Sequence, residues 1–179
     1  MNKKLISSVL SGCFAMSSLP VLAAFDNEVK GTRFEEAVSV LSALKIMNGD
    51  ENGEYRLNDT IIRSELTKMA VTAMGMETAA ESSKGNRDYT DVGTDHWANG
   101  YIHVATSLGL VEGDGDGNFR PNEPITYREA VAIMVRAAGY EKTAQSRGGY
   151  PKGHIAIANE NKMTKSVEGT SEDPISRGN

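Results

Sequence analysis

The sequence predicts an all-α protein made of tandem helix-loop-helix units, and three observations support this prediction. The chain matches itself without a gap at an offset of 64 residues, with ten identical positions shared by segments 46–75 and 110–139. Within each copy, apolar residues recur at helical spacing on both sides of a polar, glycine-containing loop. Gly75 and Gly139 stand where the second helix of each copy would end. A repeat of this kind indicates small units that cannot bury their apolar faces alone, so the copies are expected to pack together.

The first copy is predicted to begin with a helix capped by Thr32, because Glu35 follows three residues later as in a capping box. Apolar residues then recur at helical spacing until about Ile46. A second helix is predicted over residues 63–74. Its start lacks a side-chain cap because Ile62 occupies the cap position, which should weaken the helix start by about 1 kcal/mol.

The second copy repeats this pattern. Trp97 opens a predicted helix as a core residue, and that helix is expected to stop at Gly109. Thr126 and Glu129 form another capping box, which predicts a second helix over residues 127–138.

A third copy begins at Tyr150, where Gly153 matches Gly100 at an offset of 53 residues. The pattern then thins, and residues 175–179 resemble the start of a second helix. We therefore expect the third unit to be incomplete, so that either a longer chain or a partner supplies the missing helix, and self-association through this unit is a further expectation. The polar links 77–88 and 141–149 are predicted to be surface loops. The expected segments are a signal peptide (1–23), a first unit (25–88), a second unit (89–149) and a partial third unit (150–179).

The N-terminus has the pattern of a secretory signal. Basic residues precede an apolar stretch, and small residues follow where signal peptidase cleaves, which predicts removal of residues 1–23 by cleavage after Ala23 or Ala24. The alternative is a lipoprotein, because residues 10–13 fit a lipobox that would leave Cys13 as the lipidated first residue. No second apolar span follows, so no membrane contact is expected after signal cleavage.

Composition excludes several classes of function. The net charge of −5 argues against nucleic acid as the main partner. Cys13 is the only cysteine, so cleavage at Ala23 would leave no disulfide and no thiol nucleophile. There is no nucleophile elbow with a Ser-His-Asp order and no phosphate-binding GxxxxGK motif. We therefore predict that the protein is not an enzyme and needs no cofactor.

The acidic loops raise calcium as an alternative. Residues 112–123 place oxygen ligands at EF-hand spacing, and residues 48–59 echo them. Three features oppose this: the first ligand is Glu or Asn, the last ligand of the first loop is Asp, and prolines stand where the exiting helix should have begun. No metal site is predicted, and calcium binding is kept as the lesser alternative.

Together these residues resemble the S-layer homology (SLH) domain. The resemblance is carried by YTDVGTDHWANGYIHVATSLGLV at 89–111 and by GDGDGNFRPNEPITYREAVAIMVRAAGY at 113–140, and it weakens over 150–179. It implies modules arranged in threes with pseudo-threefold symmetry. It also implies a non-catalytic anchor that holds an exported protein on secondary cell-wall polysaccharide or a peptidoglycan-linked glycan. The expected location is the cell wall or S-layer, outside the cytoplasmic membrane.

The ligand implied by this resemblance is a pyruvate ketal on an amino sugar, which presents a carboxylate on a hydroxyl-rich ring. Arginine binds carboxylates bidentately, an aromatic face packs on a sugar, and a helix N-terminus offers unpaired backbone donors to an anion. The candidate binding residues are Arg63, Trp97, Arg128, Arg177, Gly49, Asp50, Gly113, Asp114, Arg56 and Arg120. Helix capping or ligand contact is expected of Glu65, Thr126 and Glu129.

The copies depart from the family pattern in different places. Tyr127 stands at the usual Arg position, which places Arg128 one residue late, and Arg33 stands at the Trp position. Asn179 replaces the expected Glu in the third copy. Arg63 therefore ranks first as a ligand contact. The main alternative function is a surface-layer or protein-interaction module that uses the same helices without binding sugar.

Overall fold

The computed structural model describes residues 28–165, 167 and 169–179, so the predicted signal peptide and Cys13 lie outside the described residues. The regular elements of the described part are helices, with isolated β-bridges between loops, which confirms the all-α prediction. The helices are α2 (Glu35–Ala43), α3 (Arg63–Ala73), α4 (Glu77–Ser82), α5 (Asn99–Ser107), α6 (Tyr127–Ala137), α7 (Glu141–Ser146) and α8 (Lys152–Glu160). No helix in this part of the chain is long and apolar enough to cross a membrane.

Three equivalent isoleucines close a ring of hydrogen bonds at the centre of the fold. Ile61 donates its N–H to the carbonyl of Ile175, Ile175 donates to Ile125, and Ile125 donates back to Ile61, each at 3.1 Å. All three side chains are buried. One residue from each unit therefore occupies the same place in a closed cycle, which confirms the expected pseudo-threefold arrangement.

A carbonyl in the loop before each isoleucine accepts a hydrogen bond from a backbone N–H of the preceding unit. In the first two units this N–H belongs to the first residue of a helix. Arg63 N–H donates to Glu123 at 3.0 Å, Tyr127 N–H to Asp173 at 2.8 Å and Arg177 N–H to Asp59 at 2.8 Å. These amides would otherwise lack intrahelical partners. The expectation that helix N-termini offer unpaired donors to an anion is therefore wrong for these residues, because the neighbouring unit's loop already accepts their hydrogen bonds.

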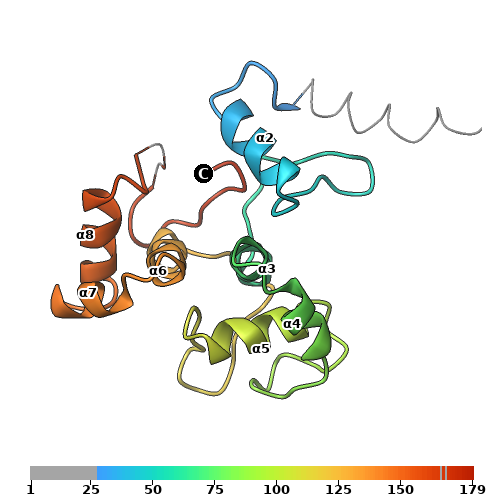
Figure 1. The fold of residues 1–179 in the computed structure, drawn as a ribbon, viewed down its shortest axis with the longest axis vertical. Coiled ribbons are helices and arrows are strands. Elements are labelled where there is room, and N and C mark those ends of the chain that lie inside the picture. Colours follow the sequence, from blue (N-terminus) through green and yellow to red (C-terminus); the bar gives the residue numbers. More distant parts are fainter. Residues whose placement is uncertain (1–27, 166, 168) are drawn as a thin grey trace, which may run out of the picture.

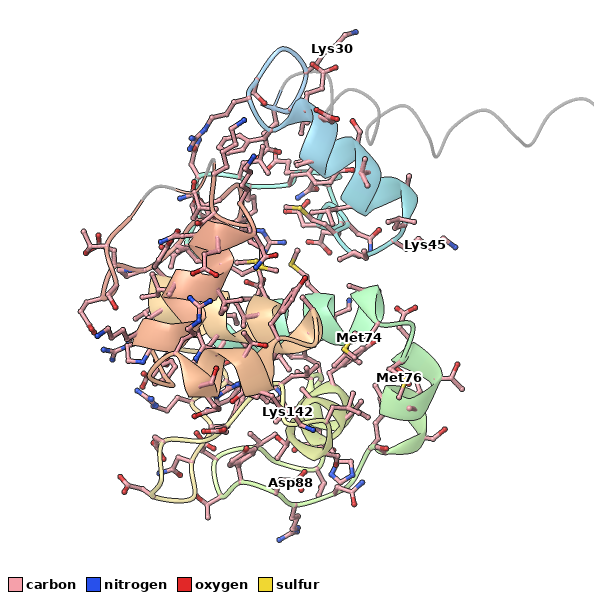
Figure 2. All side chains as sticks on the ribbon, turned by 60° about the vertical axis from the view of Figure 1, so that its left-hand side comes forward. Lys30, Lys45, Met74, Met76, Asp88 and Lys142 are labelled. Carbon is pink, nitrogen blue, oxygen red and sulfur yellow. The ribbon has the colours of Figure 1, made fainter. Side chains whose placement is uncertain are left out.

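Helices from successive units pack together. The second helix of one unit, α3, packs on α4 and on α5 of the next unit, and α6 packs in the same way on α7 and α8 (Figure 1). Met74 and Met76 lie at the turn between α3 and α4 (Figure 2), and α4 packs on α5. The main apolar cluster accordingly joins α3, α4 and α5 to the three central isoleucines.

Two links predicted as loops contain helices, so that prediction was wrong. Ala80 of α4 and Ala144 of α7 are fully buried. They lie so close to the next helix that a Cβ on Gly100 would stand 1.9 Å from the Ala80 carbonyl oxygen, and one on Gly153 would stand 2.0 Å from that of Ala144. The six-residue helices are too short and too polar to show an apolar period, and they form because a glycine in the next helix admits them.

The first helix differs from its counterparts. The predicted capping box at Thr32 is wrong, because α2 starts at Glu35 after Phe34, and the Glu35 carboxylate accepts the N–H of Gly31 at 2.6 Å. Val40 on α2 is 52% exposed, whereas the equivalent Val104 and Ile157 are 6% and 2% exposed. No helix covers this face of α2 within the described residues.

The close helix contact gives a test of the packing. Gly153→Ala should lower the free energy of unfolding by about 1–3 kcal/mol, because the added methyl group meets backbone that cannot move aside. Glu36→Ala, at the equivalent but exposed position of α2, is the control and should change stability by less than about 0.5 kcal/mol. Helix propensity alone predicts the opposite sign for the glycine change, so a stabilised Gly153→Ala protein in chemical denaturation would contradict this packing.

Candidate binding site between the first two units

A cavity of about 240 Å³ lies where α3 of the first unit meets the loop and α6 of the second, next to Tyr150. Four arginines, three carboxylates and an apolar wall surround it. Its lining residues are Arg63, Thr67, Val111, Glu112, Gly113, Asp114, Phe119, Arg120, Ile125, Arg128, Glu129, Ala132, Ile133, Arg136 and Tyr150.

Six candidate residues predicted from the sequence meet in this lining. They are Arg63, Gly113, Asp114, Arg120, Arg128 and Glu129. The other seven do not line it: Trp97, Arg177, Gly49, Asp50, Arg56, Glu65 and Thr126. The equivalent positions of the first and third units account for most of this second group, since they belong to other junctions of the ring.

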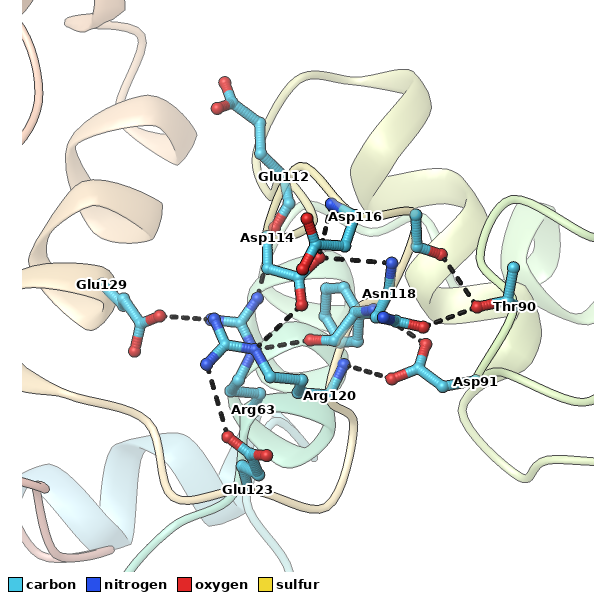
Figure 3. Close-up of polar contacts among 12 residues, drawn as sticks. Arg63, Thr90, Asp91, Glu112, Asp114, Asp116, Asn118, Arg120, Glu123 and Glu129 are labelled. Carbon is cyan, nitrogen blue, oxygen red and sulfur yellow. Dashed lines mark hydrogen bonds and ion pairs between the residues drawn. The ribbon is translucent and has the colours of Figure 1, made fainter.

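Arg63 is 6% exposed and is held by internal partners (Figure 3). Its Nη1 pairs with Glu129 at 2.7 Å, its Nε donates to the Phe119 carbonyl at 2.8 Å, and its Nη2 donates to the Glu112 carbonyl at 3.2 Å. The guanidinium also lies 4.8 Å from the centre of the Phe119 ring. Most of its donors are therefore already used, so Arg63 shapes the cavity more than it is free to bind a ligand.

Glu129 acts in two ways at once. One oxygen pairs with Arg63, and the other accepts the N–H of Thr126 at 2.9 Å and its hydroxyl at 2.7 Å. The expected cap of α6 therefore forms, and the same carboxylate ties the first unit to the second. Burial raises the pKa of Glu129, but the Thr126 hydrogen bonds and the Arg63 charge outweigh this, so its pKa lies below its ordinary value.

The junction between the third and first units repeats this arrangement. Arg177 pairs with Glu65 at 2.5 Å and donates from Nε to the Tyr55 carbonyl at 3.0 Å. Glu65 also accepts the N–H of Ile62 at 3.1 Å, so it still supports the start of α3 although Ile62 has no capping side chain.

The remaining junction, between the second and third units, lacks the buried pair. Tyr127 stands at the arginine position, Asn179 at the glutamate position and Gly169 at the aromatic position. A Cβ on Gly169 would lie 3.9 Å from the Tyr127 ring. The departures seen along the sequence in two different copies thus belong to one interface, where a tyrosine ring fills space left by a glycine.

The repeated loops are shaped by their glycines and aspartates. A Cβ on Gly113 would meet the Asn118 carbonyl oxygen at 2.6 Å, and one on Gly49 would meet that of Gly53 at 2.5 Å. The Asp114 carboxylate accepts two backbone amides within its own loop, and the first of these, from Asp116, holds the pKa of Asp114 below its ordinary value. Asp50 accepts amides in the same way. These four residues are therefore turn-forming.

The two loop arginines have left-handed backbone and nearby carboxylates. Arg56 pairs with Asp59 at 2.7 Å on the surface. Arg120 lies 3.4 Å from Glu123 and 3.5 Å from Asp114, at the mouth of the cavity (Figure 3). Only Arg120 of this pair reaches the candidate site.

Trp97 is not the core residue that the sequence suggested. It is 48% exposed, lies before α5 and stacks on His96 with ring centres 5.7 Å apart. Its apolar face is free for contact away from the cavity. Within the described residues, no group of three His, Cys, Asp or Glu side chains assembles that could hold a metal ion.

Three residues were not predicted from the sequence: Arg136 and Tyr150, which line the cavity, and Glu172, which pairs with the lining residue Arg128. Arg136 donates to the Leu110 carbonyl and pairs with Glu112 and Glu141, the last two at 3.2 Å. Tyr150 occupies the place of Trp97 at the offset of 53 residues, which was an available signal. Glu172 pairs with Arg128 across the rim, and its local sequence showed nothing of this contact.

The closed ring of helix-loop-helix units, with an arginine-lined cavity at one junction, defines a repeat-built all-α module. A family model for the S-layer homology domain matches residues 29–67 and 88–131. The chain belongs to this family, and the segment after Tyr150 completes the ring as a third unit.

Proteins of the cell surface are among its relatives. The middle cell wall protein of Brevibacillus brevis is 34% identical over 171 residues, covering 92% of this chain and 16% of that protein. The surface layer protein of Brevibacillus choshinensis is 33% identical over 169 residues, covering 92% of this chain and 15% of that protein. An amylopullulanase of Thermoanaerobacterium thermosulfurigenes is 32% identical over 119 residues, covering 66% of this chain and 6% of the enzyme. The chain thus spans about a sixth of the length of the first two relatives.

Substitution of Arg63 and of Arg56 compares the stability contribution of a buried ion pair with that of a surface ion pair. Arg63→Ala should lower the free energy of unfolding by about 3–5 kcal/mol, because it leaves the Glu129 carboxylate without its counter-ion in a buried setting. Arg56→Ala should change it by less than about 1 kcal/mol, since its pair with Asp59 is exposed. Urea denaturation followed by circular dichroism measures both, and equal losses would contradict the assigned role of Arg63.

The lowered pKa of Glu129 predicts a pH dependence. The folded state favours the ionised form of Glu129 more than the unfolded state does. This stabilisation is therefore complete above pH 4.5, the ordinary pKa of the group, and is lost as the pH falls through its lower pKa in the folded state. The stability difference between wild type and Glu129→Gln should therefore shrink in acid. Denaturation curves measured across this range test it, and a difference that grows on acidification would contradict the sign.

Proposed function

We propose that the chain anchors an exported protein to the cell wall by binding an anionic cell-wall polysaccharide in the cavity between its first two units. The observation that supports this proposal is that four guanidinium groups and an apolar wall line the same cavity. The names of its cell-wall and surface-layer relatives support the location outside the cytoplasmic membrane.

A pyruvylated amino sugar suits this cavity. Its carboxylate would bind guanidinium groups at the rim, where Arg120 and Arg128 are partly exposed. Its ketal methyl group and the apolar face of its ring would pack on Val111, Ala132 and Ile133. Arg63 supports the site from beneath, so Arg128 and Arg120 replace it as the leading ligand contacts.

Trp97 and the junction of Arg177 with Glu65 are proposed as secondary contacts. The exposed indole offers an aromatic face to a sugar ring. Arg177 occupies a position equivalent to that of Arg63. At its junction, however, Ser64 takes the position that Arg128 has in the main cavity. Binding at this second junction should therefore be weaker for an anionic sugar.

A protein-interaction module is the second candidate function, favoured by the exposed face of α2 around Val40 and Leu44. Self-association through the third unit belongs to this alternative. Calorimetry with soluble wall polysaccharide separates the two functions, because this alternative predicts no heat of sugar binding.

The sugar-binding proposal makes a matched prediction. Arg128→Gln should weaken binding to walls that carry pyruvylated polysaccharide about tenfold or more, because one charge-assisted contact to the carboxylate is lost. Arg147→Gln removes a surface arginine that pairs with Glu160 away from the cavity, and should leave binding unchanged. Wall pull-down assays measure both. Equal binding of the wild type to walls with and without the pyruvylated polysaccharide would contradict the ligand.

A further inference from the structure

We propose that Glu172 is an internal competitor for the ligand carboxylate, and so sets the affinity and selectivity of the cavity. Glu172 lies on the loop of the third unit outside the cavity lining, and its Oε1 forms an ion pair with Nη1 of Arg128, which lines the cavity. This proposal rests on the proposed function, since it concerns how the same cavity receives an anion.

Arg128 has fewer carbonyl and carboxylate partners than the other three cavity arginines within the described residues. Arg63 has three acceptors, and Arg136 has a carbonyl and two carboxylates. Arg120 lies 3.5 Å and 3.4 Å from two carboxylates, and its Nε, like that of Arg128, is buried without a hydrogen bond in the described part of the chain. Arg128 pairs with Glu172 alone among carboxylates, and its Nε is buried with no hydrogen-bond partner in the described part of the chain. An incoming oxygen acceptor would therefore satisfy a donor that the fold leaves open.

The ion pair is also exposed enough to exchange. The Arg128 side chain is 35% exposed and that of Glu172 is 65% exposed. No other hydrogen bond of the Glu172 side chain links it to the described residues. Pairs of this kind contribute little net stability, because water and salt compete for both charges. A ligand carboxylate can thus take the place of Glu172 without breaking the buried contacts of Arg63.

Comparison among the three units shows that both charges occur at one junction alone. Glu172 stands where the other loops carry Asn58 and Asn122, and Arg128 stands where the other units have Ser64 and Gly178. The helix amides still bond to the next unit's loop in the same pattern, as Arg128 N–H does to the Ser171 carbonyl at 3.2 Å. The ring therefore closes with or without this pair, and the pair is an addition at this one junction.

The consequence for binding follows from charge. A ligand carboxylate must displace Glu172 from Arg128, and it approaches a like charge while doing so. A neutral ligand does not compete for the guanidinium in this way. Glu172 therefore lowers affinity for anionic sugars specifically, so that only a ligand with further good contacts to the cavity binds tightly.

The experiment uses the whole chain and two probes, a pyruvate ketal of an N-acetylated amino sugar glycoside and its methyl ester. Glu172→Gln should raise affinity for the carboxylate form about two- to fivefold, as expected for loss of a partly exposed competing ion pair. Affinity for the methyl ester should not change. In an Arg128→Gln background, Glu172→Gln should have no effect on either probe, because the group for which the carboxylates compete is gone. Titration calorimetry at low salt measures all of these.

Glu160→Gln is the matched control, since it removes the same charge and a similar exposed ion pair, with Arg147, away from the cavity. Glu172→Asn introduces the residue of the other two loops, and provides a second test if Glu172→Gln disturbs the loop. If the Glu172 and Glu160 variants bind the carboxylate probe with the same affinity as the wild type, the proposed role of Glu172 is wrong, while the proposed function stays intact. Weaker binding by both Glu172 variants would also overturn this role, by making Glu172 a support for Arg128. Failure of the wild type to bind the carboxylate probe would overturn the proposed function and this proposal with it.

Discussion

The fold depends on a closed cycle of backbone hydrogen bonds that passes once through each unit. Ile61, Ile125 and Ile175 donate to one another around the pseudo-threefold axis, and the helix starts beside them donate to the next unit's loop. Each unit thus satisfies the backbone donors that the preceding unit leaves open. Removal of one unit would expose polar groups at two junctions, so the units are not independent domains.

Side chains on this common frame make the junctions unequal. Two junctions carry an arginine, buried in the case of Arg63 and half-buried in that of Arg177, held by a glutamate that also supports a helix start. A buried ion pair of this kind is a stronger constraint on geometry than on net stability, because desolvation offsets much of its attraction. At the third junction Tyr127 lies beside Gly169, and a surface pair of Arg128 with Glu172 is added. The backbone is near-symmetric while the chemistry is different at each junction.

This inequality explains why the candidate site forms at one junction. Arg128 belongs to the start of α6 but reaches the cavity between the first two units, and Tyr150 reaches it from the third. All three units therefore contribute to one site, although two of them form most of its lining.

The sequence by itself determined the repeat, the helical class, the main helices to within a few residues and the likeness of Gly113 and Asp114 to Gly49 and Asp50. These follow from local patterns, because turn geometry and helical spacing are properties of short segments. It also singled out several junction residues, among them Arg63, Arg128 and Glu129, but it assigned Arg63 to a ligand and missed Arg136 and Glu172. Only the tertiary structure decided that Arg63 pairs with Glu129, 66 residues away, and that Arg128 pairs with Glu172, 44 residues away. It likewise decided that α4 and α7 form, because Gly100 and Gly153 lie in the next unit. For both ion pairs the deciding partner is distant in the chain, so no local pattern could indicate whether a charge was used within the fold or left for a ligand.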